Sequence, residues 1–106
     1  MPKYLIKASY TAEGIKGVMK DGGTKRRQAA EAAVKSTGGK LEGFYFAFGE
    51  SDAYVIVDAP DNASVAASTL AIGASGLVKA TTVVLLTPEE IDQAITKGAT
   101  YTPPGR

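Results

Sequence analysis

The feature that most constrains the fold is a β-hairpin pattern between residues 44 and 60, FYFAFGESDAYVIVDAP. Two apolar, aromatic-rich stretches flank the segment GESD (residues 49–52), whose residue types are typical of a turn. Strand-like and helix-like stretches alternate on both sides of this hairpin, in the order strand, helix, strand, strand, helix, strand. That order predicts a ferredoxin-like βαββαβ fold of the α+β class, with a four-stranded antiparallel sheet and its helices on one face.

Capping residues and glycines set the expected limits of the elements. We expect strands over residues 4–10, 41–48, 53–59 and 77–86. Helices are predicted to begin after the N-caps Thr11, Asp61 and Thr87, and the last of these starts a capping box. A further helical stretch is expected from residue 24 to the glycine pair 38–39, after an interruption at residues 21–23.

Composition describes one ordinary globular domain, covering residues 1–106. A net charge of +1 gives no electrostatic drive towards nucleic acid or anionic membranes, so neither is an expected partner. The absence of Cys and His excludes thiolate-rich zinc sites, His- or Cys-ligated haem and His-activated nucleophiles, and we expect no metal and no cofactor. No apolar run reaches spanning length or resembles a secretory signal, so the expected location is cytoplasmic.

The predicted sheet carries apolar residues on both faces. The second and fourth strands have large apolar side chains at odd and at even positions, whereas the two main helices can cover one face only. In the second strand, Phe44, Phe46 and Phe48 alternate with Leu41, Tyr45 and Ala47; in the fourth, Leu77, Val83 and Leu85 alternate with Val78, Val84 and Leu86. We expect the second face to be covered by another copy of the chain in a homodimer. The alternative is that the short C-terminal helix folds back over it, since Ile91, Ala94 and Ile95 are expected to point inward.

The chain resembles the GYD-domain family of small bacterial proteins in three segments, YTAEGIKGVMKDGG, GGKLEGFYFAFGESDAYVIVDAPDNASVAA and GLVKATTVVLLTPEEI. The likeness runs from about Tyr4 to Ile91. That family is grouped with the dimeric α/β-barrel superfamily, in which two ferredoxin-like subunits pack sheet against sheet. The resemblance therefore implies the fold and the homodimer but assigns no activity. The family usually has Gly, a variable residue, Tyr and Asp in its name-giving motif; Gly49 and Asp52 match it, whereas Ser51 stands at the tyrosine position.

The hairpin offers one candidate ligand site. Asp52, with Gly49, could place a carboxylate at the mouth of the hairpin beside aromatic strands. The alternative is that Gly49 has a positive φ in the turn and Asp52 only accepts hydrogen bonds from turn amides. Tyr10 and Tyr45 could line a pocket between the sheet and a dimer partner, although aromatic side chains in strands more often serve packing.

A basic cluster around the glycine pair 22–23 offers a second candidate. Helix-opening glycine amides beside a guanidinium, with Arg27 as the favoured ligand, could hold a carboxylate or phosphate. The other interpretation is a solvated helix face, and the stretch is not a P-loop because Gly23 occupies the lysine position. The cluster comprises Lys16, Lys20, Lys25, Arg26 and Arg27.

These patterns favour a small homodimeric domain that binds a small molecule, either in a cleft between sheet and helices or between subunits. One alternative, which the resemblance implies, is a cofactor-independent enzyme such as the oxygenases and lactone isomerases of the superfamily. Without His, such an enzyme would have to use Asp52, Tyr10 or Tyr45. The other alternative is an RNA-binding sheet, but the basic and aromatic signature of that module is missing.

Overall fold

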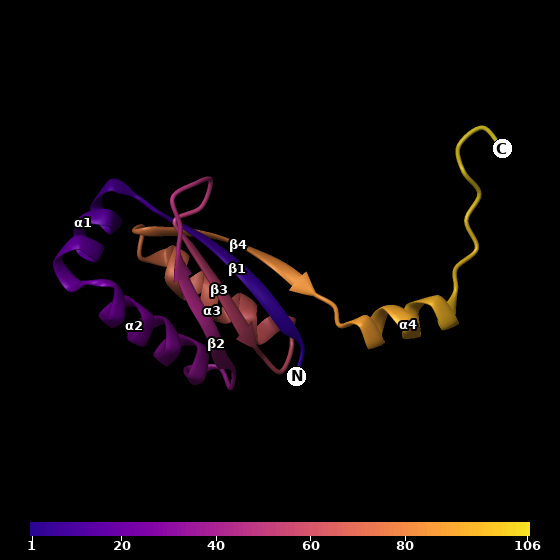
Figure 1. Cartoon of the computed structure of the whole chain (residues 1–106), viewed down its shortest axis with the longest axis horizontal. Coiled ribbons are helices and arrows are strands. Elements are labelled where there is room, and N and C mark those ends of the chain that lie inside the picture. The colour runs from indigo at the N-terminus through magenta and orange to yellow at the C-terminus, as the bar shows by residue number, and fades with distance from the viewer.

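The computed structural model, which describes residues 1–106, contains four strands and four helices and confirms the α+β prediction (Figure 1). Along the chain they are β1 (Lys3–Tyr10), α1 (Ala12–Asp21), α2 (Gly23–Ser36), β2 (Lys40–Phe46), β3 (Ala53–Asp58), α3 (Asn62–Ala74), β4 (Val78–Leu85) and α4 (Pro88–Lys97). The strands form a single antiparallel sheet in the order β2-β3-β1-β4. This order is the ferredoxin-like arrangement, with the first and third strands at the centre of the sheet.

The predicted helix starts are confirmed by their hydrogen bonds. The Gly14 amide donates to the Thr11 hydroxyl over 3.2 Å, which caps α1. Asp61 caps α3 in the same way. At α4 the capping box is complete: the Glu90 amide donates to Thr87 Oγ1 at 3.1 Å, and the Thr87 amide donates to Glu90 Oε1 at 3.0 Å. Each cap satisfies a backbone amide that the first helical turn leaves without an intrahelical partner.

The core lies between one face of the two central strands and the helices α2 and α3. It is built from Tyr4 and Ile6 of β1, Val55 and Val57 of β3, and the helix residues Val34 and Val65, together with Ala59. Only 12 of the 106 residues are buried, so the core is thin and the outer strands are poorly covered. Val84 of β4, for example, is 53% exposed although its register places it on the helix side.

A β-bulge in β2 corrects the predicted pattern of that strand. Leu41 pairs with Val57 and Gly43 with Ile56, so Glu42 is an extra residue without an opposite number. Leu41 therefore shares the helix side with Phe44, and the expectation that it lies on the face of Tyr45 is wrong. The alternation rule failed because one inserted residue reverses the parity of everything before it.

The open face, which is the sheet face away from α1, α2 and α3, is mixed rather than uniformly apolar. An apolar stripe crosses it, formed by Leu5, Tyr45, Tyr54, Ile56, Val83 and Leu85. Charged residues flank this stripe, and three of them form an ion-pair cluster at one end of the sheet. There, Lys3 Nζ lies 2.7 Å from Glu42 Oε1 and 2.9 Å from Asp58 Oδ1. The open face thus carries charged residues beside its apolar stripe, whereas an apolar face was expected.

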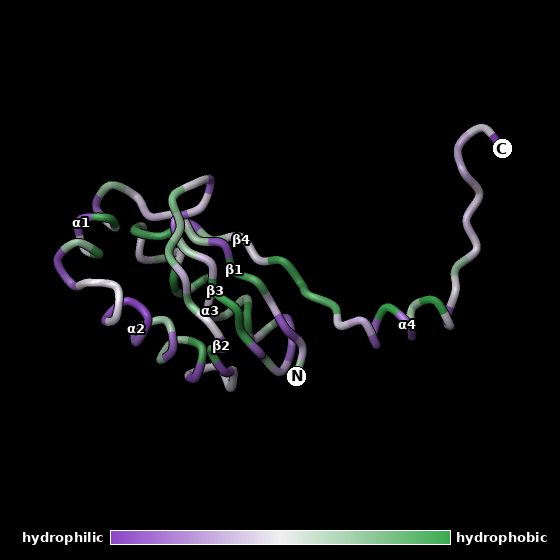
Figure 2. Tube along the Cα trace, in the orientation of Figure 1, coloured by the Kyte–Doolittle hydropathy of each residue, from purple (hydrophilic) through white to green (hydrophobic).

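Helix α4 does not fold back over the open face, which contradicts the alternative proposed for covering it. The helix leads away from the sheet and buries none of its residues (Figure 1). Ile91 is 45% exposed and Ile95 is 73% exposed, so their expected inward position is wrong. Along α4, hydrophobic and hydrophilic stretches alternate (Figure 2). Because only two residues separate β4 from Pro88, the chain is too short to turn back across the sheet before the helix begins.

Candidate functional site

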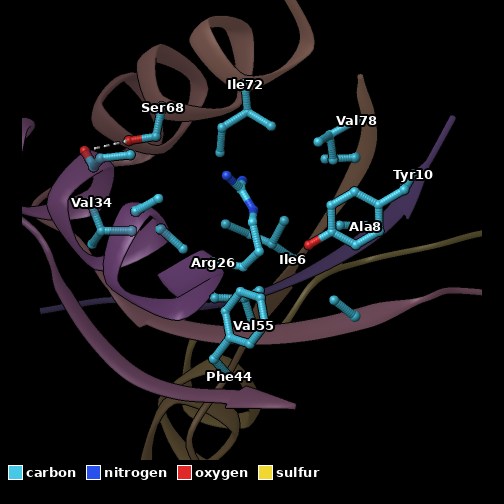
Figure 3. A pocket seen from close by; sticks show the side chains of 15 residues that line it. Ile6, Ala8, Tyr10, Arg26, Val34, Phe44, Val55, Ser68, Ile72 and Val78 are labelled. Carbon is cyan, nitrogen blue, oxygen red and sulfur yellow. Dashed lines mark hydrogen bonds between the residues drawn. The ribbon is translucent and has the colours of Figure 1, made fainter. Parts of the chain in front are cut away.

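A cavity of about 90 Å³ lies between the sheet and the helices α2 and α3 (Figure 3). Small side chains create this space, because alanines occupy wall positions where larger residues would fill the core. These alanines are Ala8, Ala53 and Ala80 on the sheet and Ala29, Ala30 and Ala33 on α2. The remaining walls are mostly Ile, Val and Phe side chains, so the cavity is apolar on nearly all sides.

Arg26 is the charged side chain of this cavity. It is half-buried in the first turns of α2, and its guanidinium reaches into the middle of the space (Figure 3). It takes part in none of the ion pairs or side-chain hydrogen bonds of the protein; the nearby pair is Lys25 Nζ with Asp21 Oδ1, at 3.8 Å. The guanidinium therefore faces an apolar chamber with its donors available.

The local fold explains why Arg26 points inward. Gly22, at φ 86°, ends α1 and starts α2, so that α2 runs across the sheet as a separate helix. Arg26 precedes Ala29, Ala30 and Ala33 at spacings of three, four and seven, which places all four on one helical face. Arg27 lies one residue further around the helix and is exposed.

A second, more polar cavity of about 190 Å³ adjoins the first. It lies between α1 and the start of β4, and the two cavities share Tyr10, Arg26 and Val78 as lining residues. Its other walls are Gly14, Gly17, Val18, Asp21, Ser75 and Leu77. We call the apolar space the inner cavity and this one the outer cavity. The three shared residues, among them the polar Tyr10 and Arg26, mark the place where the two cavities meet.

Two hydroxyl side chains also line the inner cavity, and only one of them lacks a hydrogen-bond partner within the protein. Ser68 Oγ lies 3.0 Å from Thr37 Oγ1 and is also within reach of the Ser64 carbonyl, so it serves to join α3 to the end of α2. The Tyr10 hydroxyl has no partner in the protein and is directed into the same space as Arg26 (Figure 3). Tyr10 and Arg26 are therefore the two polar groups that a molecule in the inner cavity would meet.

Asp52 holds the backbone of Tyr10 in place through a hydrogen bond. Its carboxylate Oδ2 accepts a hydrogen bond from the Tyr10 amide at 2.8 Å, and its own amide donates to the Ala8 carbonyl at 2.9 Å. The alternative predicted for the hairpin is wrong in detail, since Asp52 binds the neighbouring strand rather than turn amides and Gly49 has no positive φ. The reason is that the six-residue loop from 47 to 52 is long enough to lean on β1 without a tight turn.

The other predicted site residues lie apart from the cavity. Tyr45 is on the open face, opposite Tyr54, and is 65% exposed. Arg27 and Gly49 are exposed, on α2 and on the hairpin loop respectively. Of the five predicted residues, the structure thus brings together Tyr10 and Asp52, and it adds Arg26, which was considered only as part of a basic cluster.

The family comparison agrees with the resemblance seen in the sequence. The model of a family described as GYD domain matches residues 4–95, from β1 into α4. The chain belongs to the GYD-domain family. No curated protein and no solved structure matches this GYD domain significantly. Ser51, which stands where the resemblance expects a tyrosine, is 8% exposed and precedes Asp52, whose amide donates to the Ala8 carbonyl of β1.

The shifted ionisable groups of this GYD domain lie at structural contacts. Hydrogen bonding to Lys3 lowers the pKa of Asp58, and hydrogen bonds to Glu42 and then Asp58 raise the pKa of Lys3. The pKa of Asp61 is lowered by the hydrogen bond from the Ser64 amide that it caps. No group of three or more His, Cys, Asp or Glu side chains could hold a metal ion, and no helix combines the length and apolarity that crossing a bilayer requires.

Proposed function

We propose that this GYD domain binds a small molecule in the inner cavity between the sheet and the helices. The observation that carries the proposal is the junction of the two cavities at Tyr10 and Arg26. An apolar chamber with a few converging polar groups and an opening to the surface is the usual form of a small-molecule site. The polar groups here have no other structural task, since neither side chain has a partner within the protein.

Binding accounts for this site better than catalysis. A cofactor-independent reaction needs a general base within hydrogen-bonding reach of the substrate. No carboxylate lines the inner cavity, and the Asp52 carboxylate is already bonded to the Tyr10 backbone amide. Arg26 presents a guanidinium, which has hydrogen-bond donors and no acceptor, so it cannot take a proton from a substrate. The walls therefore offer groups for recognition, and the Tyr10 hydroxyl is the one side chain on them that an enzyme without His could use.

We further propose that two copies associate through their open faces. The apolar stripe there includes Leu5, Ile56 and Val83, which no element of the same chain covers. Burying a large apolar side chain is worth roughly 1.5 kcal/mol or more, and a two-fold pairing buries two copies of the same stripe. Sheet-to-sheet packing would leave the inner cavity of each subunit intact, because that cavity lies on the other side of the sheet.

A cavity-filling variant tests the binding proposal. Ala33→Leu should fill the inner cavity, whereas Ala32→Leu adds the same side chain at the exposed neighbouring position. Toluene, titrated into ¹⁵N-labelled protein, should shift amide resonances of residues around the cavity in the wild type and in Ala32→Leu. It should leave them unchanged in Ala33→Leu. Equal toluene binding by all three proteins, or shifts confined to other surfaces, would contradict the proposal.

Two adjacent substitutions test the dimer. Val83→Lys places a charge on the open face, and Val84→Lys places one on the helix side at a half-exposed position. Light scattering at micromolar concentration should show a dimer for the wild type and for folded Val84→Lys, but a folded monomer for Val83→Lys. A well-folded monomeric wild type would refute the association through open faces.

A further inference from the structure

We infer that the ligand of the inner cavity is a small organic anion, with one carboxylate and an apolar body of about six non-hydrogen atoms. The inference rests on the proposed binding function and adds the chemical class of the ligand. Three features carry it: the unpaired charge of Arg26, the apolar walls around it, and the size of the space.

The single positive charge of Arg26 favours a ligand with a single negative charge. A guanidinium that is partly withdrawn from water is stabilised by an anionic partner, and a carboxylate matches its planar donors with two parallel hydrogen bonds. Arg26 has no such partner in the protein; Asp21, the one acidic residue lining either cavity, shares the outer cavity with Arg26 but pairs with Lys25 at 3.8 Å. The Tyr10 hydroxyl supplies a further donor on the same side.

The walls exclude more strongly charged or sugar-like ligands. Arg26 is the one cationic side chain of the inner cavity, so a phosphate dianion would retain uncompensated charge there. Hydroxyl groups on the body of a ligand would meet alanine, valine and isoleucine side chains and lose their hydrogen bonds to water. The partner that fits is therefore apolar except for its one acidic group.

The volume limits the size of that apolar body. About 90 Å³ corresponds to roughly six to nine water-sized spheres, less than the cavity of about 150 Å³ that holds benzene in another protein, so the apolar body can be no larger than a single ring or a short branched chain. Tyr10 and Arg26 line both cavities and would hold the carboxylate where the two cavities meet. Benzoate has this combination of size, shape and charge and is a suitable probe.

A matched set of probes tests the inference. Benzoate, benzyl alcohol and benzylamine share the ring but are anionic, neutral and cationic, and acetate has the carboxylate without the ring. Amide shifts in ¹⁵N spectra and calorimetry should show benzoate binding to the wild type at least about tenfold more tightly than any other member of the set. Arg26→Gln should lower the benzoate affinity by about tenfold or more and leave the benzyl alcohol affinity unchanged.

Two further variants separate charge from folding. Arg27→Gln removes the neighbouring exposed guanidinium and should bind benzoate like the wild type. Arg26→Lys keeps the charge but loses the planar donor pair, so its benzoate affinity should fall between those of the wild type and Arg26→Gln. The retained benzyl alcohol affinity of Arg26→Gln serves as evidence that its cavity is intact.

The outcomes distinguish this inference from the proposal beneath it. If benzyl alcohol binds as tightly as benzoate, and Arg26→Gln changes neither, the anionic class is overturned while binding in the cavity stands. If benzoate binds but Arg27→Gln weakens it as much as Arg26→Gln does, the assignment to the inner cavity is overturned. If no probe shifts the cavity residues of the wild type, toluene included, both the ligand class and the binding function fall.

Discussion

Substituting Gly14 by alanine should destabilise the protein, because helix α1 approaches the start of β4 closely at this residue. A Cβ atom on Gly14 would lie 2.2 Å from the Leu77 carbonyl oxygen and 3.3 Å from Tyr10 Cβ. The helix cannot retreat freely, since the same Leu77 oxygen accepts a hydrogen bond from the Thr11 amide at 2.9 Å. Gly14 is thus the residue that lets α1 dock against the end of the sheet.

The magnitude follows from three effects. Restoring an ordinary contact distance requires a shift of roughly 1 Å, and overpacking of this kind costs about 1–3 kcal/mol. Weakening the Thr11–Leu77 hydrogen bond adds about 1 kcal/mol. Alanine then recovers about 1 kcal/mol through its better helix propensity, which leaves a net loss of about 2 kcal/mol for Gly14→Ala.

The same helix provides a matched control. Gly17 has nothing within 4 Å of a built Cβ atom, so Gly17→Ala should gain about 0.5–1 kcal/mol from helix propensity alone. Urea unfolding followed by circular dichroism, at one protein concentration for all variants, measures both changes. The reasoning is refuted if Gly14→Ala is as stable as Gly17→Ala, because the two substitutions differ only in the space around the new methyl group.

Two further predictions concern carboxylates. Asp52→Asn should cost about 1 kcal/mol or less in a thermal melt, because the amide oxygen can still accept from the Tyr10 amide; a larger loss would show that the charge itself matters. Since the pKa of Asp58 is lowered, chiefly by the hydrogen bond from Lys3, the stability it contributes is present above the usual value of 3.8 and is lost as pH falls through its folded pKa. The pKa of Lys3 is raised by Glu42 and Asp58, so its contribution is present below 10.5 and lost as pH rises through its folded pKa. Lys3→Met should flatten both ends of a pH–stability curve measured by urea unfolding, and an unchanged curve would contradict the role of this cluster.

The fold was predictable wherever short-range signals decide it. The caps at Thr11, Asp61 and Thr87 depend on residues three positions away, and the glycine at position 22 breaks the helix by its own backbone preference. The bulge at Glu42 was not predictable in this way, because it depends on the register between β2 and β3. The direction of α4 was not predictable either, because it depends on which surface the helix packs against.

The candidate site likewise has residues that short-range patterns predict and residues whose positions depend on strand pairing. Tyr10 could be predicted as a lining residue, but its separation from Tyr45 depends on which sheet face each strand residue occupies. Arg26 had a signal that was available, since it lies at helical spacing from Ala29, Ala30 and Ala33. That signal was concealed by neighbouring lysines and by Arg27, which make the whole segment resemble a solvated face. Charge runs therefore need to be divided by helical position before they are assigned to solvent.

Helix α4 has a consequence for how the molecule can be observed. A helix of ten residues without tertiary contacts is marginal in water, even with a complete capping box. Its helical population is then set by whatever covers Ile91 and Ile95, whereas the amides of β1 are protected by the sheet. Deuterium uptake in α4 should accordingly be fast in an isolated subunit and slow once these two side chains are buried. The rate of deuterium uptake by the amides of α4 therefore reports association, without a label and without a change to the cavity.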